Sequence, residues 1–511
     1  HTCSSNCIYC PCDLRMPKSY LANEPACQRA ELTFFDPYVQ VAARLQALHQ
    51  MGHSTDKVEL IVLGGTWSDY PEGYQYWFIK ELFRALNDWP NSPSYIQERL
   101  DWYTSFGLQN TEEALSSFVA EQQAAVFEDT ATYNQAFHKL YDTSQPHQSA
   151  WSQMESTYDE LVEQQHVNET AAARVVGLVI ETRPDTITPD NLHMFRQLGC
   201  TKIQIGIQST RQEILDANKR QMSAAQIKRA FSLIRLYGFK IHSHLMVNLL
   251  GATPEADKQD FKTFVTDPGF LPDEIKLYPC ALVSGTQLVQ KYREGTWQPY
   301  DKDELVDVLV QDVLNTPPYV RISRMIRDIS ATDILVGNKH TNLRQMVEQE
   351  LAAKDVARRV QEIRFREINQ QQVRAAELTL QDFPYTTAVS DEHFLQWVTA
   401  DNKIAGFCRL SLPHWDKLTS GACDVSANEL LVQPGQAMIR ELHVYGQALS
   451  LGSEGMSAQH QGLGQKLLAK ASSIAAEAGY TSLNVISSIG TRAYYRAQDF
   501  TDAGLYQQKA L

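Results

Sequence analysis

This sequence lacks three features: long apolar runs, an even set of cysteines for disulfide pairing, and an excess of basic over acidic residues. No run of eighteen apolar residues occurs, so we predict no membrane-spanning helix, and the first residues are not a signal peptide. The nine cysteines are odd in number and three stand close together, which favours a reducing, cytoplasmic location over a disulfide framework. The net charge of −14 argues against a protein that coats nucleic acid everywhere, but it leaves room for a local basic groove.

The length of the chain predicts more than one domain. A chain of 511 residues is too long to fold around one ordinary hydrophobic core. Its composition, with 43% apolar and 21% charged residues, is that of a globular protein. We therefore expect two or three domains. Residue 1 is His rather than Met and stands beside a cysteine loop, so we also expect an N-terminal arm to precede it.

The cysteine loop is the strongest local pattern. Cys3, Cys7 and Cys10 are spaced C-x3-C-x2-C. Three thiolates this close can hold an iron–sulfur cube and leave its fourth iron open to a small molecule. On these residues alone two alternatives stay open: a zinc knuckle with Cys12 as fourth ligand, or a disulfide pair.

Short apolar stretches alternate with helical ones in the first part of the chain, which predicts a partial (β/α) barrel. Val58–Leu63 is a strand that runs into glycines, and Val175–Ile180 is apolar throughout, as parallel strands buried on both faces are. Between them, residues 91–165 predict a helical insertion that covers the barrel wall. Further strands are expected at 202–207, 240–246 and 274–279, and helices at 39–51, 74–87, 190–198, 224–237 and 255–265.

Polar residues follow the ends of the predicted strands. Glu181, Gln208, His244 and Lys276 would all lie at one rim, the mouth of the barrel. One such residue alone would be expected only to make a hydrogen bond at the rim, but four at successive strand ends favour a functional site. Gly64-Gly65-Thr66 ends another strand, and glycines there let the backbone approach a ligand closely.

A basic stretch follows the barrel pattern. Residues 321–374 hold eleven Lys or Arg against seven Asp or Glu, within an acidic chain. Arg321, Arg324 and Arg327 recur every third residue. A solvated helix face is the plain interpretation, and a phosphate-contacting patch is the functional one.

From Glu377 the pattern changes to shorter strands, which indicates a second domain. Strands are predicted at 403–410, 437–444 and 483–487, and a helix at 465–478. Gln459-His460-Gln461-Gly462-Leu463-Gly464 precedes that helix, and such a loop turns backbone N–H groups and a helix N-terminus toward a pyrophosphate. Tyr494 and Tyr495 fall in a following helix.

These patterns together resemble a known family. The cysteine loop resembles that of radical S-adenosylmethionine (SAM) enzymes, and the glycine loop resembles the acetyl-CoA site of GNAT acetyltransferases. The fusion of the two resembles the catalytic subunit of Elongator and its single-chain prokaryotic relatives, which modify the wobble uridine of tRNA. The stretches that carry the resemblance are Cys7–Pro11, Gly52–Glu59, Gly64–Thr66, Ile180–Asp185, Gln204–Ser209, Lys276–Pro279, Arg440–Gly446 and Gln459–Gly462.

The resemblance implies an α/β protein in which a partial (β/α) radical SAM barrel precedes a mixed α/β GNAT acetyltransferase domain. We place the barrel at residues 1–315, a basic linker region at 316–375 and the GNAT domain at 376–511. Prokaryotic relatives often carry a cysteine-rich zinc segment between the domains, but residues 360–367 contain no cysteine, so we expect no zinc there. The long insertion at about 91–165 favours a bacterial single-chain member.

The chemistry that the resemblance implies is that of a tRNA carboxymethyluridine synthase. A [4Fe–4S] cluster on Cys3, Cys7 and Cys10 would cleave SAM, and the adenosyl radical would take a hydrogen from the methyl group of acetyl-CoA. The carbon radical would add to C5 of the wobble uridine, and hydrolysis would release CoA. The other implied partners are the tRNA anticodon stem-loop and an electron donor; a homodimer is left open.

The resemblance also implies roles for individual residues. The catalytic residues would be Lys276, Tyr494 and Tyr495. Cofactors would be held by Gly64, Gly65, Thr66, Glu181, Gln208, Glu441, Leu442, His443, Val444, Gln459, His460, Gln461, Gly462, Leu463, Gly464 and Tyr495. The tRNA would contact Arg321, Arg324, Arg327, Lys339, Arg344, Arg364 and Arg366.

Two other functions compete with this one. The first is a protein lysine acetyltransferase whose cluster is structural. The second is a tRNA-binding scaffold without chemistry, which the intact Cys7, Cys10 and Gln459-x-x-Gly462-x-Gly464 speak against, since a scaffold needs neither cluster nor cofactor loop.

Overall fold

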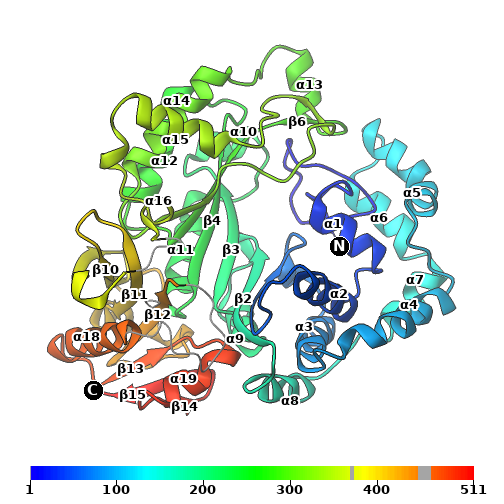
Figure 1. Cartoon of the computed structure of the whole chain (residues 1–511). Helices are drawn as coiled ribbons and strands as arrows, with labels where there is room; N and C mark the ends of the chain where they lie inside the picture. The colour runs from blue at the N-terminus through cyan, green and yellow to red at the C-terminus, as the bar shows by residue number, and fades with distance from the viewer. Residues whose placement is uncertain (1, 369–372, 447–461) are drawn as a thin grey trace.

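The computed structural model describes residues 2–368, 373–446 and 462–511 and contains two large sheets (Figure 1). The first is six-stranded and parallel, in the order β1-β2-β3-β4-β5-β7. Its strands are β1 (Lys57–Val62), β2 (Arg174–Thr182), β3 (Lys202–Gln208), β4 (Lys240–Val247), β5 (Glu274–Pro279) and β7 (Arg321–Arg324). It is the predicted partial barrel, an open half-barrel with helices packed on its outer face.

The helices around this half-barrel follow the predicted alternation. They are α1 (Pro25–Leu32), α2 (Pro37–Gln50), α3 (Glu72–Asn87), α9 (Pro189–Gln197), α10 (Gln212–Ala217), α11 (Ala224–Leu236), α12 (Pro254–Thr266), α13 (Leu288–Arg293) and α14 (Lys302–Asn315). Each predicted strand and helix is present to within a few residues, because the apolar periodicity marks which faces must be buried.

The segment predicted as a helical insertion is helical. It forms α4 (Ile96–Ser105), α5 (Glu112–Phe127), α6 (Tyr133–Tyr141), α7 (Gln145–Trp151) and α8 (Tyr158–Asn168). Figure 1 shows α4 to α7 together on the N-terminal side of the half-barrel, while α8 packs against α3. Tyr133 and Tyr141 donate hydrogen bonds to the carbonyls of Met16 and Leu14, so the insertion supports the N-terminal loop.

The two faces of the parallel sheet differ in chemistry. One face carries Ile203 beside Ile241, and Ile275 two positions further along, and it packs against the helices. The opposite, concave face carries polar residues at matching register positions: Lys202, Gln204, His242, His244, Glu274 and Lys276. Because side chains alternate along a strand, this whole polar row lies inside the half-barrel.

The second sheet is mixed and seven-stranded, in the order β14-β15-β13-β12-β11-β10-β9. Its strands are β9 (Thr379–Thr386), β10 (Ser390–Val398), β11 (Ile404–Pro413), β12 (Gln436–Val444), β13 (Ser482–Val485), β14 (Thr501–Ala503) and β15 (Tyr506–Ala510). Its helices are α17 (Trp415–Ser420), α18 (Leu463–Glu477) and α19 (Arg492–Arg496). This is the mixed α/β domain that the sequence predicts.

The chain between β5 and β9 also forms short elements: β6 (Leu282–Val283), β8 (Ile334–Val336), α15 (Leu343–Ala353) and α16 (Ile363–Arg366). The interpretation of Arg321, Arg324 and Arg327 as a solvated helix face is wrong. Arg321 and Arg324 belong to β7, which pairs with β5 as the last strand of the half-barrel. A three-residue repeat does not distinguish a helix from a short strand followed by a turn.

Buried charges join the two sheets. Arg440 of β12 donates to both oxygens of Asp273, which directly precedes β5, at 2.6 and 2.8 Å, and to Glu392 of β10 at 2.9 Å. All three side chains are at most 1% exposed. Arg409 of β11 also reaches the Asp273 carboxylate, at 3.3 Å. The second sheet is therefore docked at the N-terminal ends of the barrel strands.

No helix in the described part of the chain combines the length and apolarity that a membrane crossing requires.

Candidate active site in the mouth of the half-barrel

The cysteine loop is anchored to the half-barrel by Ile8. Its N–H donates to the carbonyl of Asn218 and its carbonyl accepts from Leu288, at 3.2 and 2.9 Å. The side chain is 3% exposed and packs in a small apolar cluster with Ile214, Leu249 and Leu288. One apolar residue between the cysteines thus fixes the loop over the carboxyl ends of the strands.

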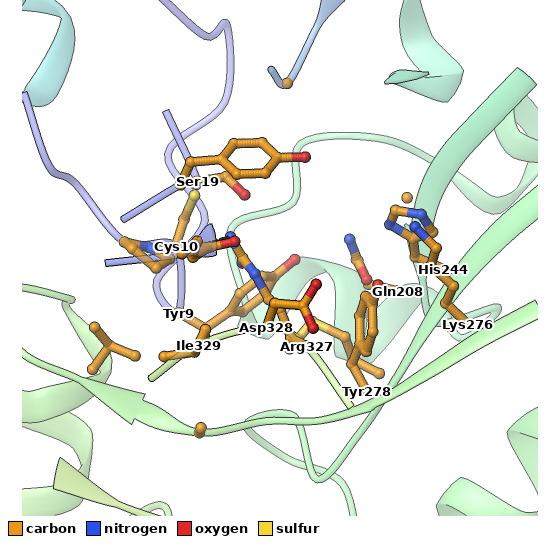
Figure 2. Close-up of a pocket in the computed structure, with 18 of the residues that line it drawn as sticks. Tyr9, Cys10, Ser19, Gln208, His244, Lys276, Tyr278, Arg327, Asp328 and Ile329 are labelled. Atoms are coloured by element: carbon orange, nitrogen blue, oxygen red, sulfur yellow. Dashed lines mark hydrogen bonds and ion pairs between the residues drawn. The ribbon is translucent and has the colours of Figure 1, made fainter. Parts of the chain in front are cut away.

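A cavity of about 220 Å³ lies under this loop. Cys3, Cys7 and Cys10 line it from one side, and Glu181, Gln208, His244 and Lys276 line it from the strand ends. Figure 2 shows Cys10 on one wall and His244 and Lys276 on the opposite wall, with Gln208 between them. The fold therefore brings together three cysteines and four strand-end residues that are 171 to 273 positions apart in sequence.

The donor set suits a cluster. In the described residues no three His, Cys, Asp or Glu side chains converge on a single metal position. A cubane cluster takes each thiolate on a different iron, so its ligands need to line a common space rather than meet at one point. The three cysteines do line one cavity, and all of them are free thiols.

The electrostatics of the cysteines differ. Burial alone would raise the pKa of Cys7, but the guanidinium of Arg220, 3.5 Å from its sulfur, and the hydroxyl of Ser5 lower that pKa to about 7. Burial and the neighbouring thiol of Cys12 raise the pKa of Cys10 to about 12. Thiolates are the ligand form, so Cys7 is already poised to bind a metal and Cys10 requires the positive charge of the iron.

The strand ends on the other side of the cavity carry backbone features suited to a ligand. Gly64 and Gly65 have φ of 141° and 89°, which residues with a Cβ rarely adopt, and Gly65 and Thr66 line the cavity. Gln208 has φ of 72°, and its buried Oε1 has no hydrogen-bond partner in the part of the chain that the structure describes. A strained residue with an unpaired polar atom that faces a cavity indicates a ligand position.

Lys276 and His244 share one acceptor. The Oε1 atom of Gln204 accepts from Lys276 Nζ at 2.5 Å and from His244 Nε2 at 3.1 Å. Burial lowers the pKa of Lys276 to about 8, partly offset by the carboxylate of Glu181, and burial holds the pKa of His244 well below its usual value. Lys276 can therefore exchange a proton near neutral pH, as a general acid or base must.

The segment that follows the cysteine loop, with Tyr20 and Glu24, forms a further wall of the cavity. Tyr20 donates a hydrogen bond to Glu181, and Arg327 pairs with Glu24 at 3.2 Å while its guanidinium lies over the Tyr20 ring. Tyr278 also lines the cavity. The sequence reasoning missed Tyr20, Tyr278 and the buried Arg220. Tyr278 stands at the end of β5, where the strand-end pattern could have found it. No strand-end or spacing pattern marks Tyr20 or Arg220, which only the fold brings to the site.

The second predicted cofactor region lies on β12. Among the described residues this strand pairs with β13 from Gln436 to Ile439, so residues 440–443 extend beyond that pairing. A bulge in the β11–β12 pairing falls at Arg440. Within residues 440–444, Glu441 and His443 pair with Arg409 and Phe407 of β11, whereas Leu442 and Val444 lie on the opposite face, against the core of the second domain.

Gly462, Leu463 and Gly464 stand at the start of α18, next to the β12 edge. A Cβ on Gly464 would lie 2.7 Å from the hydroxyl of Tyr494, so that tyrosine reaches the helix N-terminus. Tyr495 is 7% exposed and packs in the domain core against Phe500. Of the two tyrosines, Tyr494 is the one positioned at the proposed cofactor loop. Gln459, His460 and Gln461 lie outside the described residues.

The basic residues divide into two groups. Arg324, Arg327 and Lys339 line the cavity mouth. Arg321, Arg344 and Arg364 are partly buried and bond Glu367, Glu362 and the carbonyl of Ser323. Arg366 is 3% exposed and donates to Gln361, Gln396, Asn402 and Pro318, so its place in the predicted tRNA-contacting set is corrected: it ties α16 to its surroundings and a polyanion cannot reach it.

Comparisons with known proteins agree with this geometry. The family model of the Radical SAM superfamily matches residues 147–263, and that of the Radical_SAM C-terminal domain matches residues 272–353. The chain is 34% identical to a protein of Dehalococcoides mccartyi named tRNA uridine(34) acetyltransferase, over 100% of this chain and 95% of that relative. It is 29% identical to Elongator complex protein 3 of Homo sapiens, over 99% of this chain and 80% of that relative.

A solved structure agrees as well. The archaeal Methanocaldococcus infernus Elp3, with an N-terminal deletion, is 30% identical and superposes with a TM-score of 0.73, covering 94% of this chain and 97% of that one.

The half-barrel, its cysteine loop and the docked mixed sheet define a radical SAM protein with an acetyltransferase-like C-terminal domain. More closely, the chain belongs to the family of tRNA uridine(34) acetyltransferases and Elongator complex protein 3.

Proposed function

We propose that this protein is a tRNA carboxymethyluridine synthase, which uses a SAM-derived radical and acetyl-CoA to modify C5 of the wobble uridine. One observation carries the proposal: the cysteine loop and the polar strand ends line a single cavity in a chain that also has a second, acetyltransferase-like domain. Full-length relatives named tRNA uridine(34) acetyltransferase support it. The domain division at 315 and 375 is part of the same proposal.

Cys3, Cys7 and Cys10 would hold a [4Fe–4S] cluster, which with bound SAM supplies an adenosyl radical and draws its electron from a protein donor. The chain's own residues would orient and shield the reactants. The backbone at Gly64, Gly65 and Thr66 would receive the amino group of SAM, and the unpaired Oε1 of Gln208 would accept a further hydrogen bond from it. Tyr20 and Arg327, which cross the cavity, would exclude water.

The acyl donor would bind at the other end of the half-barrel. Acetyl-CoA would lie along β12 at Glu441–Val444, with its pyrophosphate at the α18 N-terminus, where backbone N–H groups and the helix dipole favour an anion. The hydroxyl of Tyr494 would lie near the thioester and could protonate the leaving thiolate. The polar concave face, from Lys202 to Lys276, lies between this end and the cavity.

The exposed basic residues at the mouth would meet the tRNA. Arg324 is half exposed, and Lys339 lines the same rim. Phosphates of an anticodon stem-loop would contact them, while the target base leaves its stack to enter the cavity, as bases do in other base-modifying enzymes.

The decisive experiment is anaerobic reconstitution with iron and sulfide, followed by incubation with SAM, a reductant, acetyl-CoA and tRNA. We expect 5′-deoxyadenosine and carboxymethyluridine, measured by mass spectrometry, only when tRNA and acetyl-CoA are both present. Cys10→Ala is expected to lose iron binding and SAM cleavage while it still binds acetyl-CoA. Iron content unchanged in that variant would refute the ligand assignment.

The same assay separates the rival functions. A protein lysine acetyltransferase would acetylate a histone tail equally well with Cys10→Ala. A scaffold would bind tRNA and cleave no SAM under any condition. Either result would overturn the proposed function.

A further inference from the structure

The short helix α19 belongs to the second domain, but one carboxylate of the half-barrel holds it at both ends. Glu169 lies between α8 and β2. Its carboxylate accepts from Arg492, the first residue of α19, at 3.3 Å, and from Arg496, the last residue, at 2.6 and 3.3 Å. Tyr494 stands between these two arginines. The half-barrel therefore holds the element that carries the tyrosine of the proposed acyl-donor site.

The Glu169 carboxylate is well suited to hold this helix. It is 8% exposed, and burial alone would raise its pKa, but the hydrogen bonds from Arg496 and Arg492 lower that pKa below its ordinary value. The group is therefore ionised at neutral pH, and a hydrogen bond between charged groups is stronger than one between neutral groups. Arg496 also bonds Asp502 of its own domain at 2.6 Å, but that carboxylate is 53% exposed and screened by water.

The chain that leads into α19 is also bound to the half-barrel. The hydroxyl of Ser488 donates to the carbonyl of Val175 in β2 at 2.8 Å. A Cβ on Gly490 would lie 2.7 Å from the same carbonyl oxygen, so a glycine lets the two backbones approach this closely. Ile489 is 1% exposed and packs against Gly199, which precedes β3. Three consecutive residues thus contact the half-barrel directly before the helix begins.

The position of the Tyr494 hydroxyl depends on these contacts. That hydroxyl reaches the start of α18, because a Cβ on Gly464 would lie 2.7 Å from it. A helix of five residues is marginal by itself and needs tertiary contacts to be stable. Figure 1 shows α19 beside the second sheet, on the side where α8 and α9 of the half-barrel lie. Its anchors on that side are Glu169 and the start of β2.

We propose that Glu169 is a positioning residue for the acyl donor's chemistry: through Arg492 and Arg496 it holds Tyr494 where its hydroxyl can protonate the leaving thiolate. This inference rests on the proposed function. The Tyr494 hydroxyl gives its proton to the CoA sulfur as water displaces the thiolate, and the proton that this water loses restores the hydroxyl. No bond to Glu169 forms or breaks. The acyl-donor site is then complete only when the second domain is docked on the half-barrel.

The test compares the wild type with Glu169→Gln, Glu169→Asp, Tyr494→Phe and the double variant Glu169→Gln with Tyr494→Phe. Asp502→Asn is the matched control, because it removes the other carboxylate bonded to Arg496 by the same change of acid to amide. Hydrogen–deuterium exchange of residues 492–496 is measured first, in the full chain without cofactors. Release of CoA from acetyl-CoA is then followed in reconstituted protein with SAM, reductant and tRNA.

We expect the α19 amides of Glu169→Gln to exchange about tenfold faster than those of the wild type, because hydrogen bonds to a charged group are lost. The kcat for CoA release should fall about tenfold, while the KM for acetyl-CoA stays within about twofold, since the pyrophosphate contacts lie on α18. Glu169→Asp keeps the charge and should recover part of both losses. Asp502→Asn should resemble the wild type in both measurements.

The double variant separates positioning from general stability. Tyr494→Phe should lower kcat by about 10²-fold, as loss of a general acid does. Adding Glu169→Gln should then lower it no further, because the group that Glu169 positions is gone.

Three results would overturn the inference. The first is unchanged exchange of α19 in Glu169→Gln. The second is a double variant whose loss is the product of the two single losses, which would show that Glu169 does not act through Tyr494. The third is an equal loss of kcat in Asp502→Asn, which would show that the contact with the half-barrel has no special role. A wild type that releases no CoA would instead refute the proposed function, and the exchange measurement would still decide whether Glu169 holds α19.

Discussion

The buried ion network between the two sheets gives a prediction with a definite size. Arg440 bonds Asp273 on the half-barrel side and Glu392 on its own sheet, and the three side chains are at most 1% exposed. Arg440→Ala would leave two carboxylates buried with less compensation. Removing one partner of a buried, hydrogen-bonded ion pair costs about 3–5 kcal/mol. The equilibrium constant for opening the interface should therefore rise by roughly two to three and a half powers of ten.

Urea unfolding and limited proteolysis would measure this effect. Arg211→Ala is the control, because its ion pair with Glu213 is on the surface and should contribute at most about 1 kcal/mol. Arg440→Lys keeps the charge but not the paired geometry, so its loss should be intermediate. The C-terminal domain of Arg440→Ala should also become sensitive to protease under conditions in which Arg211→Ala resists.

The network also predicts a pH dependence. Burial alone would raise the pKa of Asp273, but Arg440 and Arg409 hold that pKa well below its usual value. A carboxyl group with a depressed pKa stabilises the fold above its unfolded pKa of about 3.9 and loses this contribution on further acidification. The difference between wild type and Arg440→Ala should thus be constant from about pH 5 to 8 and shrink below about pH 4. An Arg440→Ala protein that unfolds as Arg211→Ala does would refute the reasoning.

Two further predictions concern the sites. The Lys276 amine should titrate near pH 8, so its acylation, followed by mass spectrometry, should rise between about pH 7 and 9, and a midpoint above 10 would contradict the assignment. A lysine whose pKa is lower in the folded than in the unfolded state destabilises the fold, and this cost is complete at pH values below the folded pKa. Lys276→Met should therefore raise the free energy of unfolding at pH 7. The same variant should lower tRNA modification by about 10²-fold or more. Gly464→Ala should weaken acetyl-CoA binding about tenfold in calorimetry, because the new Cβ would lie 2.7 Å from the Tyr494 hydroxyl. Gly464→Ala with Tyr494→Ala should recover part of that loss, and no recovery would show that the clash is not the cause.

Much of the fold could be predicted from the sequence because it is encoded locally. Apolar runs such as Val175–Ile180 mark strands buried on both faces, and the 3.6-residue periodicity marks the helices between them. The cysteine spacing and the glycine loop are also local, since a cluster ligand set and a phosphate cradle are built from neighbouring residues. The family membership followed from these motifs in order along the chain.

The failures arise where a pattern has two physical solutions. Arg321, Arg324 and Arg327 repeat as a helix face would, but β7 ends after Arg324 and the pairing with β5 decides the conformation. Arg366 resembles an exposed basic residue in the sequence, but in the fold it donates to the nearby carbonyl of Gln361 and to three acceptors from distant segments. Charge in a sequence does not reveal whether its partner is water or protein.

The sequence by itself determined the elements, their order and the two ligand loops, because hydrogen bonding within helices and apolar burial act over short stretches. Only the tertiary structure decided which polar residues meet. It seated Arg220 against Cys7, more than two hundred residues away, and it docked the second sheet on Asp273 at the barrel strands' N-terminal ends. Long-range contacts of this kind depend on how whole surfaces pack, and no local pattern specifies them.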